Sequence, residues 1–173
     1  MTGQLEKRGA SAPQAQGRKL TGYAAVFNTP ADIAGYTEVI KPGAFSKSLE
    51  PGRDIVAMID HKPTKVLGRT KSGTLRLWED QKGLAYEIDL PDTTEARDLL
   101  AQVERGDIGG MSFGFTVPQG GQRWAQGKRR EITQATLHEI SVVHAWPAYS
   151  GTSVEARNKA PRLAQARRFM ETV

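Results

Sequence analysis

Hydrophobic and polar residues alternate along most of this chain, but the alternation begins only after a polar N-terminal stretch. Residues 1–18 are mainly Ala, Gln, Gly and basic residues with little to bury, which predicts a flexible arm. The pattern then becomes strand-like at residues 20–27 and 36–40. Pro42 favours the first turn of a short helix that ends near residue 49.

More strands and one clear helix are predicted in the rest of the chain. The strand-like segments lie at residues 54–61, 66–78, 83–90, 111–117 and 132–145. The helix begins after the capping signal DTTE, keeps apolar residues at helical spacing as far as Val103, and ends at Gly106. Many strands with few helices predict one domain with a β-rich barrel or an α+β fold.

Composition and charge narrow the class of protein. At 173 residues the chain suits one domain, and it contains no apolar run of the roughly 18 residues that cross a bilayer. The absence of cysteine excludes disulfides, thiolate catalysis and Cys-based zinc sites. The N-terminus lacks the apolar centre of a secretory signal, so a cytoplasmic location is expected. The net charge of +5 is concentrated at the two ends and in one loop, and a solvated basic surface is its plainer explanation.

One segment has the features of a nucleophile site. In ERGDIGGMSFGF, Ser112 stands between a Gly-Gly pair and an alternating Phe-Gly-Phe run, where the helix and a glycine turn lead into a new strand. A serine hydroxyl becomes nucleophilic when a base removes its proton and a third group orients that base. The chain contains 3 histidines, so the candidate bases are few: His61, His138 and His144.

A glutamate in the apolar run LHEISVV is a candidate for the orienting group. Strict alternation would place Glu139 on one strand face with Leu137 and Ser141, and His138 on the other face. A carboxylate in such a run is costly to bury unless it is paired, and an imidazole would pair with it. The hypothesis is a triad of Ser112 as nucleophile, His61 as general base and Glu139 as orienting acid. The same pattern is also explained by three residues without a catalytic role: a serine at the start of a strand, a solvent-exposed histidine and a glutamate on an edge strand. The pattern alone does not decide between the triad and this structural interpretation.

Several motifs occur together in a fixed order: GYAAVFNTP, EVIKPGAFSKSL, IDH near position 60, GGMSFGF around position 112 and LHEISVVHAWPAY from position 137. In this combination the chain resembles the prohead protease family of tailed bacteriophages, which is distantly similar to the herpesvirus assemblin proteases. The resemblance extends from about residue 20 to residue 157. It implies an assemblin-like β-barrel surrounded by a few helices, with a protease domain at 19–154, the arm at 1–18 and a basic tail at 155–173.

The resemblance also implies an activity and its residues. The activity is that of a serine endopeptidase that cleaves the scaffold segment of the major capsid protein, and itself, inside the immature capsid in the host bacterial cytoplasm. The family's serine falls on Ser112, its histidine on His61 and its acidic residue on Glu139. The assemblins use a second histidine as the third member, which would be His138 here. The acid is favoured, and the two are treated as mutually exclusive because strand neighbours point to opposite faces.

The same resemblance leads to expectations about cofactors, partners and the oxyanion donors. It implies no metal and no organic cofactor, a capsid protein with its scaffold segment as partner, and weak homodimerisation. The lack of a long apolar run adds the expectation that no membrane is involved. The oxyanion donors would lie in residues 147–153, where Pro147 has no N–H to offer. For His144, core packing or a surface hydrogen bond is expected rather than catalysis.

Two other functions remain open from the sequence. A non-catalytic, basic capsid-assembly or binding module would carry Ser112 as a purely structural residue. A nuclease or nucleic-acid binder is suggested by the pI of about 9.6 and by a basic hairpin at 122–130 that contains Trp124. No clustered carboxylate motif for metal ions accompanies that charge, so a specific nucleic-acid ligand is not expected. A solvated hairpin with Trp124 packed inward is the prediction for this segment.

Overall fold

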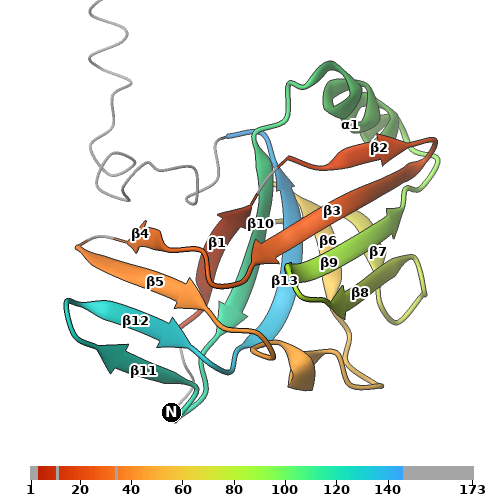
Figure 1. Ribbon diagram of the computed structural model, residues 1–173. Helices are drawn as coiled ribbons and strands as arrows, with labels where there is room; N and C mark the ends of the chain where they lie inside the picture. The colour runs from red at the N-terminus through yellow and green to blue at the C-terminus, as the bar shows by residue number, and fades with distance from the viewer. Residues whose placement is uncertain (1–3, 11, 34, 146–173) are drawn as a thin grey trace, which may run out of the picture.

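A computed structural model describes residues 4–10, 12–33 and 35–145 of the chain (Figure 1). The first half of this part of the chain contains strands and one 3-10 helix: β1 (Glu6–Ala10), β2 (Gln14–Gln16), β3 (Lys19–Val26), β4 (Ala31–Ile33), β5 (Tyr36–Ile40), η1 (Ser46–Ser48), β6 (Val56–Ile59), β7 (Lys62–Arg69) and β8 (Leu75–Glu79). The second half adds one α-helix and further strands: β9 (Gly83–Asp89), α1 (Thr94–Arg105), β10 (Gly110–Thr116), β11 (Gln122–Ala125), β12 (Arg129–Ile132) and β13 (Thr136–Val143).

The strands of the described residues form three sheets. A five-stranded sheet has the order β1-β10-β13-β6-β7, and two four-stranded sheets have the orders β11-β12-β5-β4 and β2-β3-β9-β8. Most neighbouring strands are antiparallel, but β13 pairs in parallel with β6, and β12 with β5. The β-rich prediction is therefore confirmed. The barrel surrounded by a few helices is not what the described residues show, because their sheets stay open and only α1 is an α-helix.

Local signals in the sequence account for α1. The hydroxyl of Thr93 accepts a hydrogen bond from the backbone N–H of Ala96, which caps the N-terminus. Gly106 ends the helix in the left-handed conformation, with φ of 80°, and glycine adopts that conformation without a steric penalty. Ala96 and Leu99 are buried, and Figure 1 shows α1 at one end of the molecule beside β2. The helix predicted from the capping signal and from Gly106 is confirmed.

The core lies between the sheets and depends on aromatic residues of two segments. Phe113 of β10 packs edge-on against Phe45, with ring centroids 5.6 Å apart, and stacks on Phe115 at 5.2 Å. All three rings are fully buried. Burying a phenylalanine side chain contributes about 1.5–3 kcal/mol, so this cluster fixes β10 firmly in its sheet.

Two sequence predictions for polar segments are wrong. Residues 6–10 and 14–16, expected to belong to a flexible arm, form β1 and β2 and are part of the fold. Trp124, expected to pack inward, is 57% exposed, and its aromatic contact within the described residues is a T-shaped one with the Tyr36 ring. The basic tail at 155–173 lies outside the described residues.

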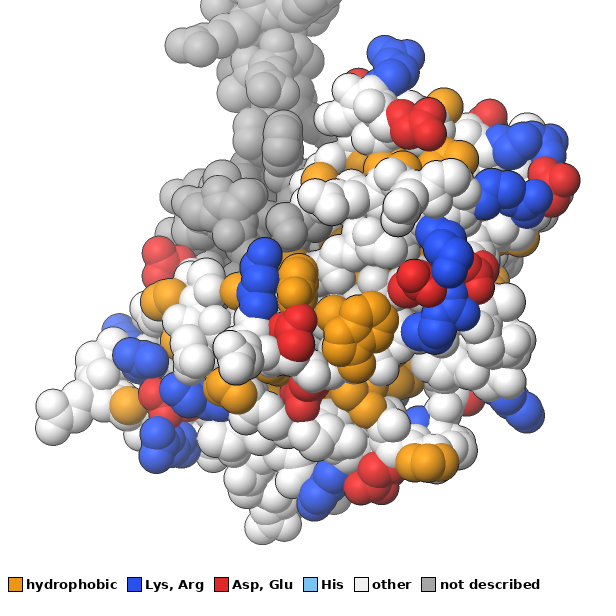
Figure 2. Space-filling view, turned by 45° about the vertical axis from the view of Figure 1, so that its right-hand side comes forward, with side chains coloured by type: hydrophobic (Ala, Val, Ile, Leu, Met, Phe, Trp, Pro, Cys, Tyr) orange, Lys and Arg blue, Asp and Glu red, His pale blue; other side chains and the backbone are white. Residues whose placement is uncertain are grey.

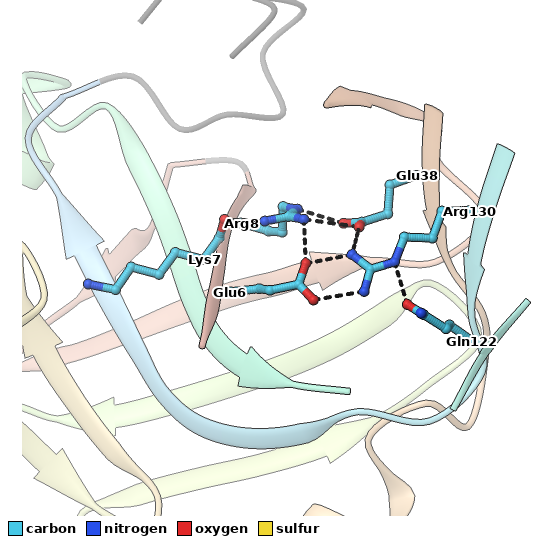
Figure 3. Close-up of polar contacts among 6 residues, drawn as sticks. All are labelled: Glu6, Lys7, Arg8, Glu38, Gln122 and Arg130. Carbon is cyan, nitrogen blue, oxygen red and sulfur yellow. Dashed lines mark hydrogen bonds and ion pairs between the residues drawn. The ribbon is translucent and has the colours of Figure 1, made fainter. Parts of the chain in front are cut away.

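A buried cluster of charged side chains explains why the polar segment at β1 is ordered (Figure 3). Arg8 of β1 donates from Nε to Oε1 of Glu38 on β5, at 2.6 Å. Arg130 of β12 donates to Oε2 of Glu38 at 2.8 Å and to Oε1 of Glu6 at 2.7 Å. Two guanidinium groups thus neutralise two carboxylates, and they tie β1 to the sheet that contains β5 and β12. Burial alone would raise the pKa of Glu6, but hydrogen bonds and positive charge from Arg130 and Arg8 hold this pKa below its ordinary value.

Glu38→Gln should lower the free energy of unfolding by about 3 kcal/mol, because it leaves the guanidinium groups of Arg8 and Arg130 with one carboxylate, that of Glu6, in place of two. The side chain of Glu38 is 0% exposed, so water cannot replace it. Chemical denaturation measures the change. Asp54→Asn is the matched control, because Asp54 accepts two hydrogen bonds from Arg69 at the surface and an exposed pair contributes about 1 kcal/mol or less. Equal losses in the two variants would contradict a structural role for the cluster.

Candidate functional site

His61 lies in a tight turn at the end of a central strand. Ile59 of β6 pairs with Lys62 of β7, so Asp60 and His61 form a two-residue hairpin turn. Both turn residues have positive φ, 49° and 57°, in a region that side chains other than glycine adopt at a cost of about 1–3 kcal/mol each. Such strain persists only where the surroundings hold it, and it is concentrated at functional sites in proteins.

The imidazole of His61 is hydrogen-bonded to Glu139 of β13. The distance between His61 Nδ1 and Glu139 Oε1 is 2.6 Å, and both side chains are largely shielded from solvent. An ionised carboxylate only accepts hydrogen bonds, so this contact places the imidazole hydrogen on Nδ1 and leaves Nε2 as the basic nitrogen. The predicted pairing of this histidine with this glutamate is present in the structure.

Ser112 lies on the strand next to Glu139 and on the same face of the sheet. Ser112 of β10 is directly opposite Ser141 of β13, and Gly114 is opposite Glu139. Directly opposite residues of an antiparallel pair share a face, with Cβ atoms about 4.5–5.5 Å apart. The backbone N–H of His61 donates to Oγ of Ser141 at 3.2 Å. The strand order β10-β13-β6 therefore gathers Ser112, Glu139 and the turn of His61 at one place on the sheet.

A β-bulge in β13 corrects the expected alternation of this strand. Phe115 is opposite Leu137 but Gly114 is opposite Glu139, so His138 is the one residue of this stretch of β13 that is skipped in the pairing register with β10. Leu137 consequently joins the hydrophobic core instead of sharing a face with Glu139. Because of the bulge, alternation along β13 no longer distinguishes Glu139 from His138 as the residue that orients His61. Their contacts distinguish them: Glu139 binds the imidazole of His61, whereas His138 is exposed and bonds through Nε2 to Thr116 Oγ1 at 3.0 Å.

His144, the third histidine, binds the turn of His61 on its solvent-exposed side through Asp60. The carboxylate of Asp60 accepts a hydrogen bond from the backbone N–H of His144 at 3.0 Å, and it lies 2.9 Å from Nδ1 of the same residue. His144 Nε2 is 3.0 Å from the amide oxygen of Gln102 on α1. Of the two roles expected for His144, core packing or a surface hydrogen bond, the structure shows the surface hydrogen bonds, and these connect the turn to the end of β13 and to the helix.

Ser141 is the residue of this site to which the sequence pattern gave no role. Its hydroxyl donates to Oε2 of Glu139 at 2.7 Å and accepts the N–H of His61. The available signal was a second polar residue two positions after Glu139 in an apolar run, since such residues share a strand face. The pattern could not show which distant residue that face would meet.

The described residues hold no group of three or more His, Cys, Asp or Glu side chains arranged to bind a metal ion. In the same part of the chain, no helix combines the length and apolar character needed to span a membrane. Residues 147–153, where the oxyanion donors were expected, lie outside the described residues.

Comparison with known proteins gives one consistent family. Residues 5–166 match the family model described as caudovirus prohead serine protease. The prohead protease of Enterobacteria phage HK97 is 34% identical over 138 residues, which are 78% of this chain and 58% of that protein. The chain thus spans less than two thirds of that relative's length.

A solved structure has a similar fold. The structure of the bacteriophage T4 capsid assembly protease aligns with a TM-score of 0.54 at 10% sequence identity, and the alignment covers 83% of this chain and 97% of that one. At this identity the likeness concerns the fold alone. The match to the family model, the relative from phage HK97 and the motifs around Ser112 and Glu139 agree, and the chain belongs to the caudovirus prohead serine protease family.

Proposed function

We propose that this chain is a capsid-maturation serine endopeptidase with Ser112, His61 and Glu139 as its catalytic triad. The observation that carries the proposal is the 2.6 Å hydrogen bond between His61 Nδ1 and Glu139 Oε1, on the strand next to Ser112. A buried imidazole–carboxylate pair beside a serine is the arrangement that activates a hydroxyl for acyl transfer. Membership of a serine protease family supports the same chemistry.

Each residue of the triad has a distinct task. Ser112 Oγ attacks the peptide carbonyl while His61 Nε2 takes its proton. The imidazolium then protonates the leaving amine, and water releases the acyl group by the same route. Glu139 holds the hydrogen on Nδ1 and stabilises the imidazolium while it carries the extra proton.

Two serines, Ser112 and Ser141, lie opposite each other at this site, and their exposure and hydrogen bonds indicate which one is the nucleophile. Ser141 is 0% exposed, and its hydroxyl hydrogen is donated to Glu139, so it is not free to attack a substrate. Ser112 is 7% exposed and lies on the strand that the glycines at 109–110 introduce. These observations support Ser112 as the nucleophile.

The substrate and setting follow from the family and from the names of the relatives. We infer that the chain cleaves the scaffold segment of the major capsid protein, and itself, within the prohead of a tailed phage or phage-like particle in its bacterial host. The relative from phage HK97 is named as a prohead protease and the family model describes prohead serine proteases, which supports this assignment. Weak homodimerisation, a closer likeness to the assemblins and oxyanion donors within residues 147–153 stay predictions.

The second candidate function, a basic module that binds without catalysis, has less support. On the face shown in Figure 2, basic and acidic side chains are intermixed and do not form one basic patch. Within the described residues many basic side chains are paired, as Lys19 and Arg76 are with Glu87. Such pairing reduces the positive potential that binding to a polyanion needs. A nucleic-acid ligand is therefore not proposed.

Ser112→Ala should lower cleavage of a co-expressed cognate capsid protein by at least about 10³-fold, because no acyl-enzyme can form. Mass spectrometry of the capsid protein and of the chain itself measures scaffold removal and self-cleavage. Ser72→Ala, which changes an exposed serine in a turn, is the control and should cleave normally. Cleavage by Ser112→Ala at the wild-type rate would remove the nucleophile assignment.

Glu139→Gln should slow the same cleavage by about 10²- to 10⁴-fold, because an amide cannot stabilise the imidazolium and favours the wrong tautomer. His138→Ala is the matched comparison and should stay within about twofold of the wild-type rate, since its imidazole bonds only to Thr116 among the described residues. The reverse pattern, with His138→Ala inactive and Glu139→Gln normal, would make His138 the third member.

Gly114→Ala should reduce cleavage by about 10²-fold or more, because an added Cβ displaces the orienting carboxylate. That Cβ would lie 2.5 Å from Glu139 Oε1 and 3.1 Å from its Cδ, and both carboxylate oxygens are already bound. Gly52→Ala is the control. It has φ of 90° and open space around it, so its cost is backbone strain of about 1 kcal/mol with no effect on the site. The Gly114 argument fails if the two variants cleave equally well.

A further inference from the structure

Ser141 is the most deeply buried polar residue around the proposed triad, and the proposed reaction gives its hydroxyl no chemical step. It lies in the middle of β13 between β10 and β6, opposite Ser112 on one side and Met58 on the other. Its neighbours in sequence, Ile140 and Val142, face the hydrophobic core. A hydroxyl in such surroundings is costly to bury without partners, so its hydrogen bonds indicate its use.

The two hydrogen bonds of Ser141 both go to members of the proposed triad. Its Oγ donates to Glu139 Oε2 at 2.7 Å and accepts the backbone N–H of His61 at 3.2 Å. The other oxygen of Glu139, Oε1, binds Nδ1 of the same histidine. These contacts close a ring that runs from Ser141 through the carboxylate to the imidazole, and back through the main chain of His61.

This closed set of hydrogen bonds restricts two parts of the site, the carboxylate of Glu139 and the turn that contains His61. A glutamate side chain has three rotatable bonds, and a carboxylate bound at only one oxygen can still rotate about the last of them. With Oε2 held by Ser141, Oε1 is directed at His61. The turn of His61 is strained and would relax without contacts, and the bond from its N–H to Ser141 holds its main chain against β13.

A second buried serine shows what the same side chain does when it has only a structural role. Ser48 of η1 donates to the carbonyl oxygen of Ala135 at 3.1 Å and accepts the N–H of Leu137 at 2.9 Å. It bridges the main chain just before and at the start of β13, and it has no contact with His61 or Glu139 among its hydrogen bonds. Ser48 and Ser141 therefore form a matched pair with equal numbers of hydrogen bonds and different partners.

We infer that Ser141 is a positioning residue of the proposed protease, which aims the Glu139 carboxylate and anchors the main chain of His61 through a single hydroxyl group. This inference rests on the proposed function, because it assigns Ser141 a part in the same reaction. The hydroxyl exchanges no proton with the substrate. It acts through the geometry of the imidazole that does.

Ser141→Ala tests the inference in the full chain. It should lower kcat by about 10- to 100-fold and leave KM within about twofold, because substrate contacts are unchanged while the base is misdirected. The substrate is a peptide that spans a cleavage site mapped with the wild-type protein. Ser48→Ala is the control: it should lose thermal stability to a similar degree and keep kcat within about twofold of wild type.

A spectroscopic readout separates positioning from loss of stability. In the non-cleaving Ser112→Ala background, the Nδ1–H proton resonance of His61 should change on adding Ser141→Ala. Adding Ser48→Ala should leave this resonance unchanged. If Ser141→Ala does not fold, Ser141→Cys replaces it, because a thiol of similar shape is a weaker donor and acceptor and should give a smaller loss of the same kind.

The failures of the two proposals are distinguishable. Cleavage that survives Ser112→Ala overturns the proposed function itself. If Ser112→Ala is inactive while Ser141→Ala keeps the wild-type kcat and an unchanged His61 resonance, the positioning role alone is overturned. A fall in kcat shared equally by Ser141→Ala and Ser48→Ala, with the His61 resonance unchanged, would likewise overturn it in favour of a purely structural role.

Discussion

The site depends on one extra residue in strand β13. Thr136 and Leu137 pair with β10 in one register, and from Glu139 onward the register is shifted by one residue, with His138 left over as the bulge. Without the bulge, His138 would lie opposite Gly114 and Glu139 would lie opposite Phe113, on the core face. A one-residue shift exchanges the two faces of a strand. The bulge is therefore what brings the glutamate, in place of its histidine neighbour, to the imidazole of His61.

Strain and hydrogen bonding balance each other in the turn that presents this imidazole. Asp60 and His61 both adopt positive φ, which costs about 1–3 kcal/mol each. Against this cost stand bonds from the turn to β13: the N–H of Asp60 to the carbonyl of Val142 at 2.9 Å, and the N–H of His61 to Ser141. Hydrogen bonds of this kind contribute about 0.5–1.5 kcal/mol each. Several small contributions thus hold a strained residue in the one orientation that reaches Glu139.

The parts of this structure that the sequence predicted are those with local causes. The cap at Thr93, the stop at Gly106 and the apolar periods of β3, β9 and β10 act within a few residues, and each is in the predicted place. The pairing of His61 with Glu139 could be proposed because a carboxylate in an apolar run needs a partner. The remaining features have non-local causes. Glu6 and Arg130 are 124 residues apart in sequence, so the polar residues 6–10 read by themselves gave no sign that β1 is ordered by a buried cluster of charges.

The second part of the motif GGMSFGF, residues 112–115, can now be explained along β10. Phe113 and Phe115 face the core, where their rings stack and are fully buried. Ser112 and Gly114 alternate with them on the opposite face, next to β13. The large residues anchor the strand, and the small ones leave the room that Glu139 fills, because a Cβ at Gly114 would collide with its carboxylate. The alternation of aromatic and small residues is therefore a single solution to two requirements: a rigid strand and an open place beside it for the acid that orients His61.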